Sequence, residues 1–190
     1  MRNDNDFITL TESGMLALWK QVMHLEPVVP GCSIERGDGI DLDAWLLTHI
    51  QQWYANLLAT APIEWVPVEN VMADVVLTAD DQGVVTAMVP PQCVRPVEWR
   101  LAGWRHSVSR FISADDPRAS IQHNALTRGG ACNPAIVDAG DHLLLLSAMP
   151  GVAPVLERAL CVVRPADGTY RLHRAALASI PTWHSTIAQL

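Results

Sequence analysis

Apolar and polar residues alternate at helical spacing in the first third of the chain. Residues 41–61 are typical of an amphipathic helix, because apolar side chains recur every three or four positions: Leu46, Ile50, Trp53 and Leu57. Asp41 or Asp43 supplies an N-cap, and Pro62 stops the helix. We therefore expect a helix over 41–61, with Trp53 as its anchor in the core.

The segment before this helix predicts a second, shorter one. Thr9 and Glu12 have the spacing of a capping box, and the apolar residues that follow favour a helix to about Leu25. Prolines and glycines fill the acidic stretch after it. We expect residues 1–40 to form an N-terminal helix and linker arm, and residues 41–190 a single α+β domain.

From Ile63 onward the pattern changes to the period of β-strands. Val97, Trp99 and Leu101 alternate with Glu98 and Arg100, as in a half-buried strand. Hairpins are expected where two apolar runs flank a polar turn, at 71–89 and at 134–146. A further strand is expected at 156–163 and a short helix at 181–190. The predicted fold class is α+β: N-terminal helices, then a mostly antiparallel β-sheet or sandwich, then a short C-terminal helix.

Composition suggests that part of the surface is covered by other subunits. Charged residues make up 17% of the 190, against about 25% in soluble domains, and there are seven tryptophans. Residues 1–94 hold thirteen acidic and three basic side chains, whereas residues 95–190 hold seven acidic and ten basic ones. Copies of the chain can pair head to tail through such halves, although an unevenly charged solvated surface explains the numbers equally well.

Targeting signals do not stand out in the sequence. The N-terminus is polar and acidic, and no apolar run reaches the ~18 residues of a membrane span. The cysteines contain no C-x-x-C pair: Cys32, Cys93, Cys132 and Cys161. We expect a soluble intracellular product with reduced thiols, most of them buried.

Catalytic and metal-binding motifs are also missing from the pattern. The histidines are scattered singly, no G-x-S-x-G occurs, and the Arg128-Gly129-Gly130 stretch lacks the setting of a phosphate loop. The sequence predicts no catalytic residue, no cofactor and no metal. An enzyme that uses Cys132 and a distant histidine is the least favoured alternative.

Six arginines gather between residues 95 and 128, with tryptophans and a phenylalanine among them. This pattern fits a nucleic-acid face. Pairing of the same arginines with carboxylates, in this chain or in a neighbouring subunit, fits the uneven charge better.

The polar passage at 113–134 supplies most of the residues that we assign to an interface or to structural support. These are Gln122, Asn124, Arg128 and Gly129, together with Trp99 and Trp104 before them. Arg128 can donate to loop carbonyls or to a neighbour's carboxylate. Gln122 and Asn124 would pin the same loop, and Gly129 with Gly130 would allow a backbone conformation closed to other residues.

The central stretch carries several short motifs in a fixed order. They are D-V-V-L-x-A (74–79), P-P-x-C-V-R-P-V-x-W (90–99), W-x-x-S-V (104–108), D-D-P (115–117), Q-x-N-x-x-x-R-G (122–129), P-A-I-V (134–137) and L-L-L-L-S (143–147). Over about residues 65–147 the chain resembles a family of small virion structural proteins of tailed phages and prophages of gut Bacteroidetes, including the crAss-like phages.

The resemblance implies a structural protein of the head–tail connector or neck-ring type, and no enzymatic activity. Its partners would be further copies of itself in a ring, the portal, and other neck or tail proteins, with DNA passing through the lumen and no membrane. The protein would be assembled in the host cytoplasm and reside in the virion. The alternative is a β-rich module that binds a small ligand or peptide on a platform of Trp99 and Trp104.

Overall fold

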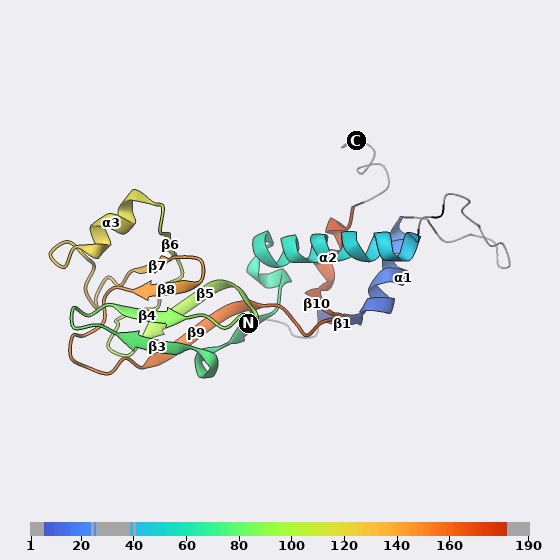
Figure 1. Cartoon of the computed structure of the whole chain (residues 1–190). Coiled ribbons are helices and arrows are strands. Elements are labelled where there is room, and N and C mark those ends of the chain that lie inside the picture. The colour runs from blue at the N-terminus through green and yellow to red at the C-terminus, as the bar shows by residue number, and fades with distance from the viewer. Residues whose placement is uncertain (1–5, 24, 26–38, 40, 182–190) are drawn as a thin grey trace. The chain divides into compact units, whose positions relative to one another are not determined.

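The chain folds into two compact units (Figure 1). In this computed structural model, residues 6–23, 25, 39 and 41–181 are described. The helical unit comprises residues 1–67 and 165–190, and the β unit comprises residues 68–164. Helices and mostly antiparallel sheets together confirm the α+β class. The chain passes between the units near 67 and 165. The division into an arm of residues 1–40 and a domain of residues 41–190 stays a prediction.

The helical unit begins with a strand that the sequence analysis did not predict. Strand β1 (Phe7–Thr11) pairs antiparallel with β10 (Thr169–His173), so segments about 160 positions apart share a sheet. Helix α1 (Glu12–Val22) starts only after it, and the Thr11 side chain accepts the cap hydrogen bond from the Gly14 N–H at 3.2 Å. The expected cap at Thr9 is therefore wrong, because Thr9 is held in the strand.

Helix α2 (Leu42–Thr60) confirms the strongest helix prediction, with Asp41 as its N-cap. Its buried face is formed by Leu46, Ile50, Tyr54, Leu57 and Leu58. Trp53 is only partly buried, and its ring meets Trp19 of α1 edge-on, with 5.8 Å between centroids. Trp19 is 1% exposed. The assignment of Trp53 as the core anchor is wrong, and Trp19 occupies that position.

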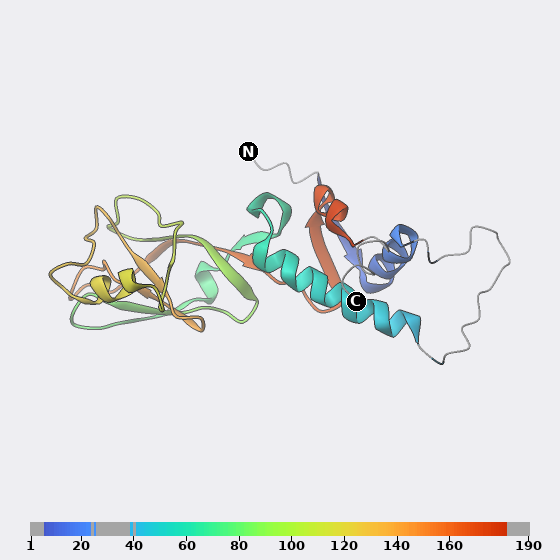
Figure 2. The same ribbon diagram turned by 90° about the horizontal axis from the view of Figure 1, so that it is seen from above.

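Helix α2 lies against the two-stranded sheet of β1 and β10 (Figure 2), and its Tyr54 side chain contacts the backbone of β10. The Tyr54 hydroxyl donates to the Arg171 carbonyl at 2.9 Å and accepts from the Arg171 N–H at 3.1 Å. Tyr54 therefore ties α2 to the backbone of β10.

Short 3₁₀ segments complete the helical unit. They are η2 (Ile63–Trp65) and η4 (Arg174–Ser179), which is the last described element. Apart from Pro181, the expected C-terminal helix at 181–190 lies outside the described residues. None of the helices in the described part of the chain has the length and apolar character needed to cross a bilayer.

The β unit contains two sheets. The three-stranded sheet has the order β2 (Val68–Asn70), β9 (Leu156–Val163), β5 (Cys93–Leu101), with antiparallel neighbours. The five-stranded sheet has the order β3 (Val76–Ala79), β4 (Val85–Met88), β8 (His142–Leu145), β7 (Ile136–Asp138), β6 (Ile112–Ser113). Only β6 and β7 run parallel among these pairs. The short segment η3 (Met72–Asp74) precedes β3, so the first expected hairpin strand is shorter than predicted.

Both sheets contribute side chains to one buried cluster, which forms the core of the β unit. Trp99 and Leu101 of β5 are inside it, as the alternation along that strand predicts, together with Leu143 and Leu145 of β8. The other face of the five-stranded sheet is covered in part by α3 (Pro117–His123), through a second cluster of Ala119, Val137 and Leu146. This helix begins at the N-cap Asp116, within the passage expected to be irregular.

Candidate functional site

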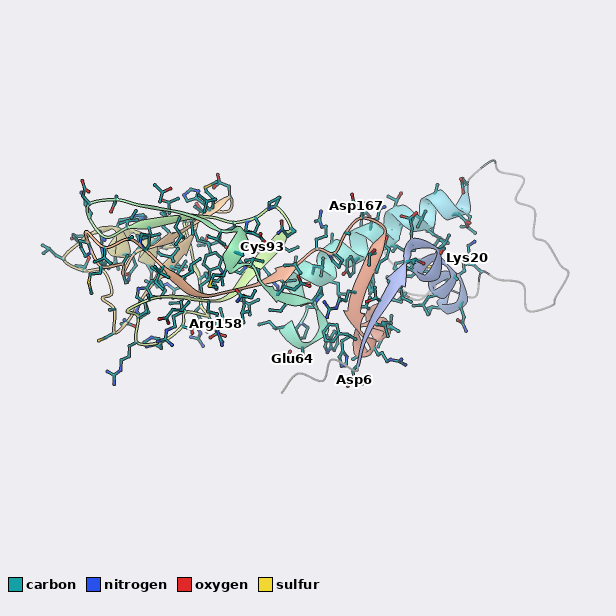
Figure 3. The ribbon with its side chains drawn as sticks, turned by 90° about the horizontal axis from the view of Figure 1, so that it is seen from below. Asp6, Lys20, Glu64, Cys93, Arg158 and Asp167 are labelled. Carbon is teal, nitrogen blue, oxygen red and sulfur yellow. The ribbon has the colours of Figure 1, made fainter. Side chains whose placement is uncertain are left out.

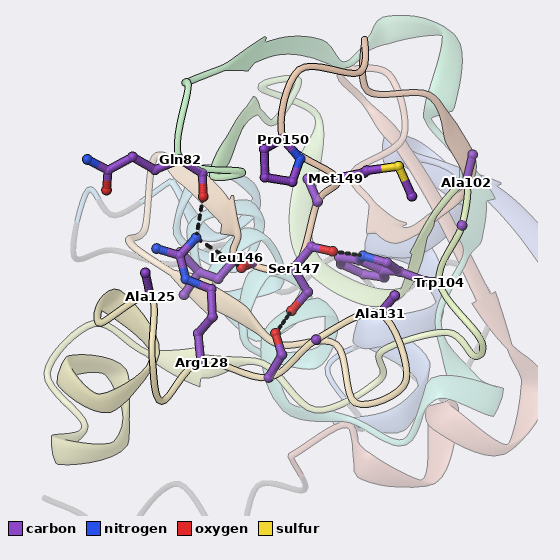
Figure 4. Close-up of a pocket in the computed structure, with 14 residues that line it drawn as sticks. Gln82, Ala102, Trp104, Ala125, Arg128, Ala131, Leu146, Ser147, Met149 and Pro150 are labelled. Carbon is purple, nitrogen blue, oxygen red and sulfur yellow. Dashed lines mark hydrogen bonds between the residues drawn. The ribbon is translucent and has the colours of Figure 1, made fainter.

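A cavity of about 460 Å³ lies at one end of the β unit (Figure 4). Four loops frame it: the β3–β4 turn, the loop after β5, the loop after α3 and the loop after β8. Seven of its fourteen lining residues are glycine or alanine, so the space exists because the loop side chains are small. Arg128 is the single charged residue among them.

Arg128 joins three of these segments through its guanidinium group. Nη1 donates to the carbonyl of Gln82 at 2.9 Å and to that of Leu146 at 3.4 Å, and Nη2 donates to the carbonyl of His123 at 3.4 Å. The expected donation to loop carbonyls is confirmed. One side chain thereby ties the α3 loop to the β3–β4 turn and to the end of β8 (Figure 4).

Gln122 and Asn124 hold the same loop, as predicted. Gln122 Oε1 accepts from the Gly129 N–H at 2.9 Å, and Asn124 Oδ1 accepts from the Leu126 N–H at 2.9 Å. The Asn124 carbonyl also accepts from the Arg128 N–H at 2.9 Å. The residues at 122–129 therefore form a compact, internally bonded loop.

Gly129 is required for a different reason from the one expected. Neither Gly129 nor Gly130 has a positive φ, so the expectation of a special backbone conformation is wrong. A Cβ at Gly129 would lie 2.0 Å from the Asn133 carbonyl oxygen, whereas one at Gly130 would meet nothing within 4 Å. The Asn133 backbone lies so close to Gly129 that a side chain cannot fit there, whereas Gly130 has room for one.

Trp104 and Ser147 fix the floor of the cavity. Trp104 Nε1 donates to the Ser147 carbonyl at 2.8 Å, and Ser147 Oγ donates to the Gly129 carbonyl at 2.6 Å. Ser147 is 8% exposed and ends the L-L-L-L-S motif, which does not itself indicate a hydrogen-bonding role. Trp104 is 2% exposed and Trp99 0%, so the proposed binding platform of two accessible indoles is wrong.

One exposed apolar side chain lines the cavity, and two more belong to residues next to its lining. Met149 lines it and is 67% exposed, Leu126 is 94% exposed next to the lining residue Ala125, and Val155 is 59% exposed. The Val155 carbonyl accepts from the N–H of Ala102, another lining residue. We refer to Leu126, Met149 and Val155 as the apolar rim.

Several arginines of the 95–128 cluster and its surroundings are paired inside the chain. Arg100 Nε lies 2.9 Å from Glu157 Oε2 across β5 and β9, and Arg118 Nη2 lies 2.6 Å from Asp116 Oδ2. Arg158 makes two contacts with the Glu98 carboxylate, at 3.0 and 2.9 Å. A hydrogen bond from Ser107, and then Arg158, hold the pKa of Glu98 below its usual value.

The two units do not divide the charge as the two halves of the sequence do. The β unit holds ten acidic and eight basic side chains, and the helical unit ten acidic and five basic ones. Both units carry a net negative charge, so the fold does not contain one acidic and one basic unit that could pair head to tail.

The described residues contain no group of three or more histidine, cysteine or acidic side chains that is arranged to hold a metal ion. Cys132 is exposed, Cys93 is partly buried and Cys161 is buried, while Cys32 lies outside the described residues. Comparison with protein-family models, curated proteins and solved structures finds no match for this chain.

Proposed function

We propose that the chain is a structural virion subunit of the head–tail connector or neck-ring type, which assembles with copies of itself and with portal, neck or tail proteins. The motifs of residues 65–147 suggest this class. The observation that carries the proposal is the apolar rim around the cavity, in a chain with few charges. Apolar surface next to a concave pocket is typical of protein contacts.

A ring requires that one face of a subunit meet a different face of the next. The cavity and its rim provide a concave, apolar face of this kind in the β unit. In the proposed subunit, the chain runs from N-terminal helices through a β-sandwich to a C-terminal helix. DNA passes through the lumen of the ring, and the subunit catalyses no reaction.

The first experiment is mass photometry and negative-stain microscopy of the purified protein, alone and with its portal protein. Rings, or complexes with the portal, are expected. Met149→Glu should abolish or strongly weaken assembly, because it places a charge in the rim. Val76→Glu is the matched control: Val76 is 63% exposed on β3 and does not line the cavity. A protein that stays monomeric at high concentration and ignores the portal contradicts the proposal.

Arg128→Ala tests the loop that supports this face. Loss of its three hydrogen bonds should weaken assembly while far-UV circular dichroism keeps the spectrum of the folded protein. Arg128→Lys should rescue little, because an ammonium group cannot reach carbonyls on three segments with the geometry of a planar fork. If Arg128→Ala assembles normally but loses DNA binding in a salt-dependent manner, the arginines serve nucleic acid instead.

The second candidate is a module that binds a small ligand or peptide. The cavity itself favours it, since about 460 Å³ falls within the ~300–1,000 Å³ of ligand pockets. Ala131→Trp places a large side chain at the cavity lining and leaves Leu126, Met149 and Val155 unchanged. If the protein is a ligand-binding module, this variant should lose ligand-induced thermal stabilisation and keep the oligomeric state of the parent.

A further inference from the structure

Two cysteines of the β unit face the same core from neighbouring strands. In the register of β5 and β9, Cys93 lies opposite Val163 and Pro96 lies opposite Cys161, so the two cysteines are diagonal neighbours. Cys161 is 0% exposed within the core cluster, and the partly buried Cys93 packs against that cluster. Figure 3 labels Cys93 on β5. Neither thiol is in a disulfide bond.

Each of the two thiols shifts the pKa of the other. A hydrogen bond with Cys93 lowers the pKa of Cys161, and the indole of Trp99 acts in the same direction. The hydrogen bond with Cys161, followed by burial, raises the pKa of Cys93. The opposite shifts make Cys161 the better nucleophile of the two, which suits it to attack the sulfur of Cys93 once Cys93 has been oxidised.

We propose that Cys93 and Cys161 form a reversible disulfide that links β5 to β9 when a two-electron oxidant of the peroxide class reaches Cys93. In the first step, the Cys93 sulfur attacks one oxygen of hydrogen peroxide, the O–O bond breaks, and sulfenic acid and water form. In the second step, the Cys161 sulfur attacks the Cys93 sulfur, the S–O bond breaks, and a second water leaves. Two thiols lose two hydrogen atoms, and one peroxide becomes two waters.

The exposure of the two cysteines determines which one reacts first with the peroxide. The partly exposed Cys93 is the thiol that a peroxide can reach, whereas Cys161 is enclosed by the core. Cys132 offers a contrast, because it is exposed on a loop and can react with any external thiol or oxidant. The pair should therefore oxidise within one chain, and Cys132 between chains.

Backbone geometry sets how stable the bond will be. Diagonal neighbours in an antiparallel pair have Cα atoms roughly 7–8 Å apart, slightly beyond the ~4.4–6.8 Å that disulfides span. The register of β5 shifts between Cys93 and Arg95, and an irregular strand at this point can move toward β9. A disulfide closed under such constraint is readily reduced, so mild dithiols should reopen it.

The test uses the full chain with Cys32→Ser and Cys132→Ser, which leaves only the pair. The folded protein is treated with hydrogen peroxide, quenched, and analysed by intact mass and by thiol titration in denaturant. The expected result is the joint loss of two thiols per chain and a mass decrease of two hydrogen atoms, reversed by dithiothreitol. Peptide mapping under non-reducing conditions should join the peptides that contain residues 93 and 161.

Cys93→Ala in the same background is the matched control. Its remaining thiol, Cys161, should survive the same treatment in the folded protein, because no exposed thiol is left to react. The proposal is overturned if the parent keeps both thiols while folded, if peptide mapping shows that the cysteines gain oxygen atoms without losing hydrogen, or if the cross-link appears only after unfolding. Peptide mapping of the unsubstituted protein gives the same decision should any cysteine variant fail to fold.

Discussion

The helical unit and the β unit differ in how completely they cover their apolar side chains. Among the described residues, two large hydrophobic side chains are exposed in the helical unit and eight in the β unit. The described part of the helical unit has two α-helices, of 11 and 19 residues, for a two-stranded sheet. The β unit has one α-helix, of seven residues, for eight strands. Among the described residues, exposed apolar surface is therefore concentrated in the β unit.

The sheet edges show the same difference. Tyr54 satisfies both backbone groups of Arg171 on β10, so that this part of the edge cannot accept another strand. Strand β3 lies at the edge of the five-stranded sheet, and its Val76 is 63% exposed. One unit covers part of its edge with a side chain, whereas the edge strand of the other carries an exposed valine.

The largest expected effect is the loss of stability when the buried tryptophan of either core is truncated. Trp19→Ala in the helical unit and Trp99→Ala in the β unit should each lower the free energy of unfolding by about 3–5 kcal/mol, because each removes a fully buried ring. Trp53→Ala should cost less, roughly 1–2 kcal/mol, because a partly exposed ring loses less buried area. Urea unfolding followed by circular dichroism measures all three.

The pattern of transitions then decides whether the units are independent. If they are, Trp19→Ala shifts one transition and Trp99→Ala the other. An equal shift of a single transition by both variants would show that the two cores unfold together, and equal costs for Trp19→Ala and Trp53→Ala would contradict the assignment of the buried ring.

A smaller effect is expected at the loop that frames the cavity. Gly129→Ala should lower stability by about 1–3 kcal/mol, because the new Cβ collides with the Asn133 carbonyl and forces the loop to move. Gly130→Ala, one position on, is the control and should stay within about 0.5 kcal/mol of the parent. Thermal unfolding of both variants tests this, and similar losses from the two would refute the steric explanation.

The smallest effect concerns α3, the only α-helix of the β unit. Hydrogen bonds from Arg118 hold the pKa of Asp116 at about 2, below the ~3.9 of an unfolded chain. A depressed pKa in the folded state means that the stabilising contribution is complete above about pH 4 and is lost as the pH falls toward 2. The Arg118 side chain is 71% exposed, so solvent screens the ion pair and the change in stability will be slight.

An NMR titration of the Asp116 carboxyl carbon measures this pKa directly. Arg118→Gln should return the pKa toward its usual value, while Asp116 still caps α3 through the backbone N–H of residue 118. A normal pKa in the parent protein would mean that the ion pair is not formed in solution.

Elements that depend on nearby residues could be predicted from the sequence. The helix over Leu42–Thr60 has its cap, stripe and stop within twenty-odd positions, and the alternation along β5 is visible in five residues. Asp116 followed by Pro117 is also a local start signal, typical of a helix, and it would have identified α3.

Elements that depend on distant partners could not. Strand β1 exists because β10 pairs with it, and Thr9 and Thr11 offer equivalent capping hydroxyls until that pairing is known. Trp53 and Tyr54 are adjacent on the same stripe, so periodicity does not tell which faces the core. The cavity needs Arg128 to meet Gln82, 46 positions earlier, and small residues from four loops to coincide.

The pairing of β1 with β10 has a consequence for the order of events during synthesis. The β unit is continuous in sequence, whereas the helical unit is interrupted by it. A ribosome must translate as far as His173 before β1 can acquire its partner, and by then the whole of 68–164 has been made. Since domains fold as units while they emerge, the later unit in the sequence has the opportunity to fold first, and the earlier segment waits for it.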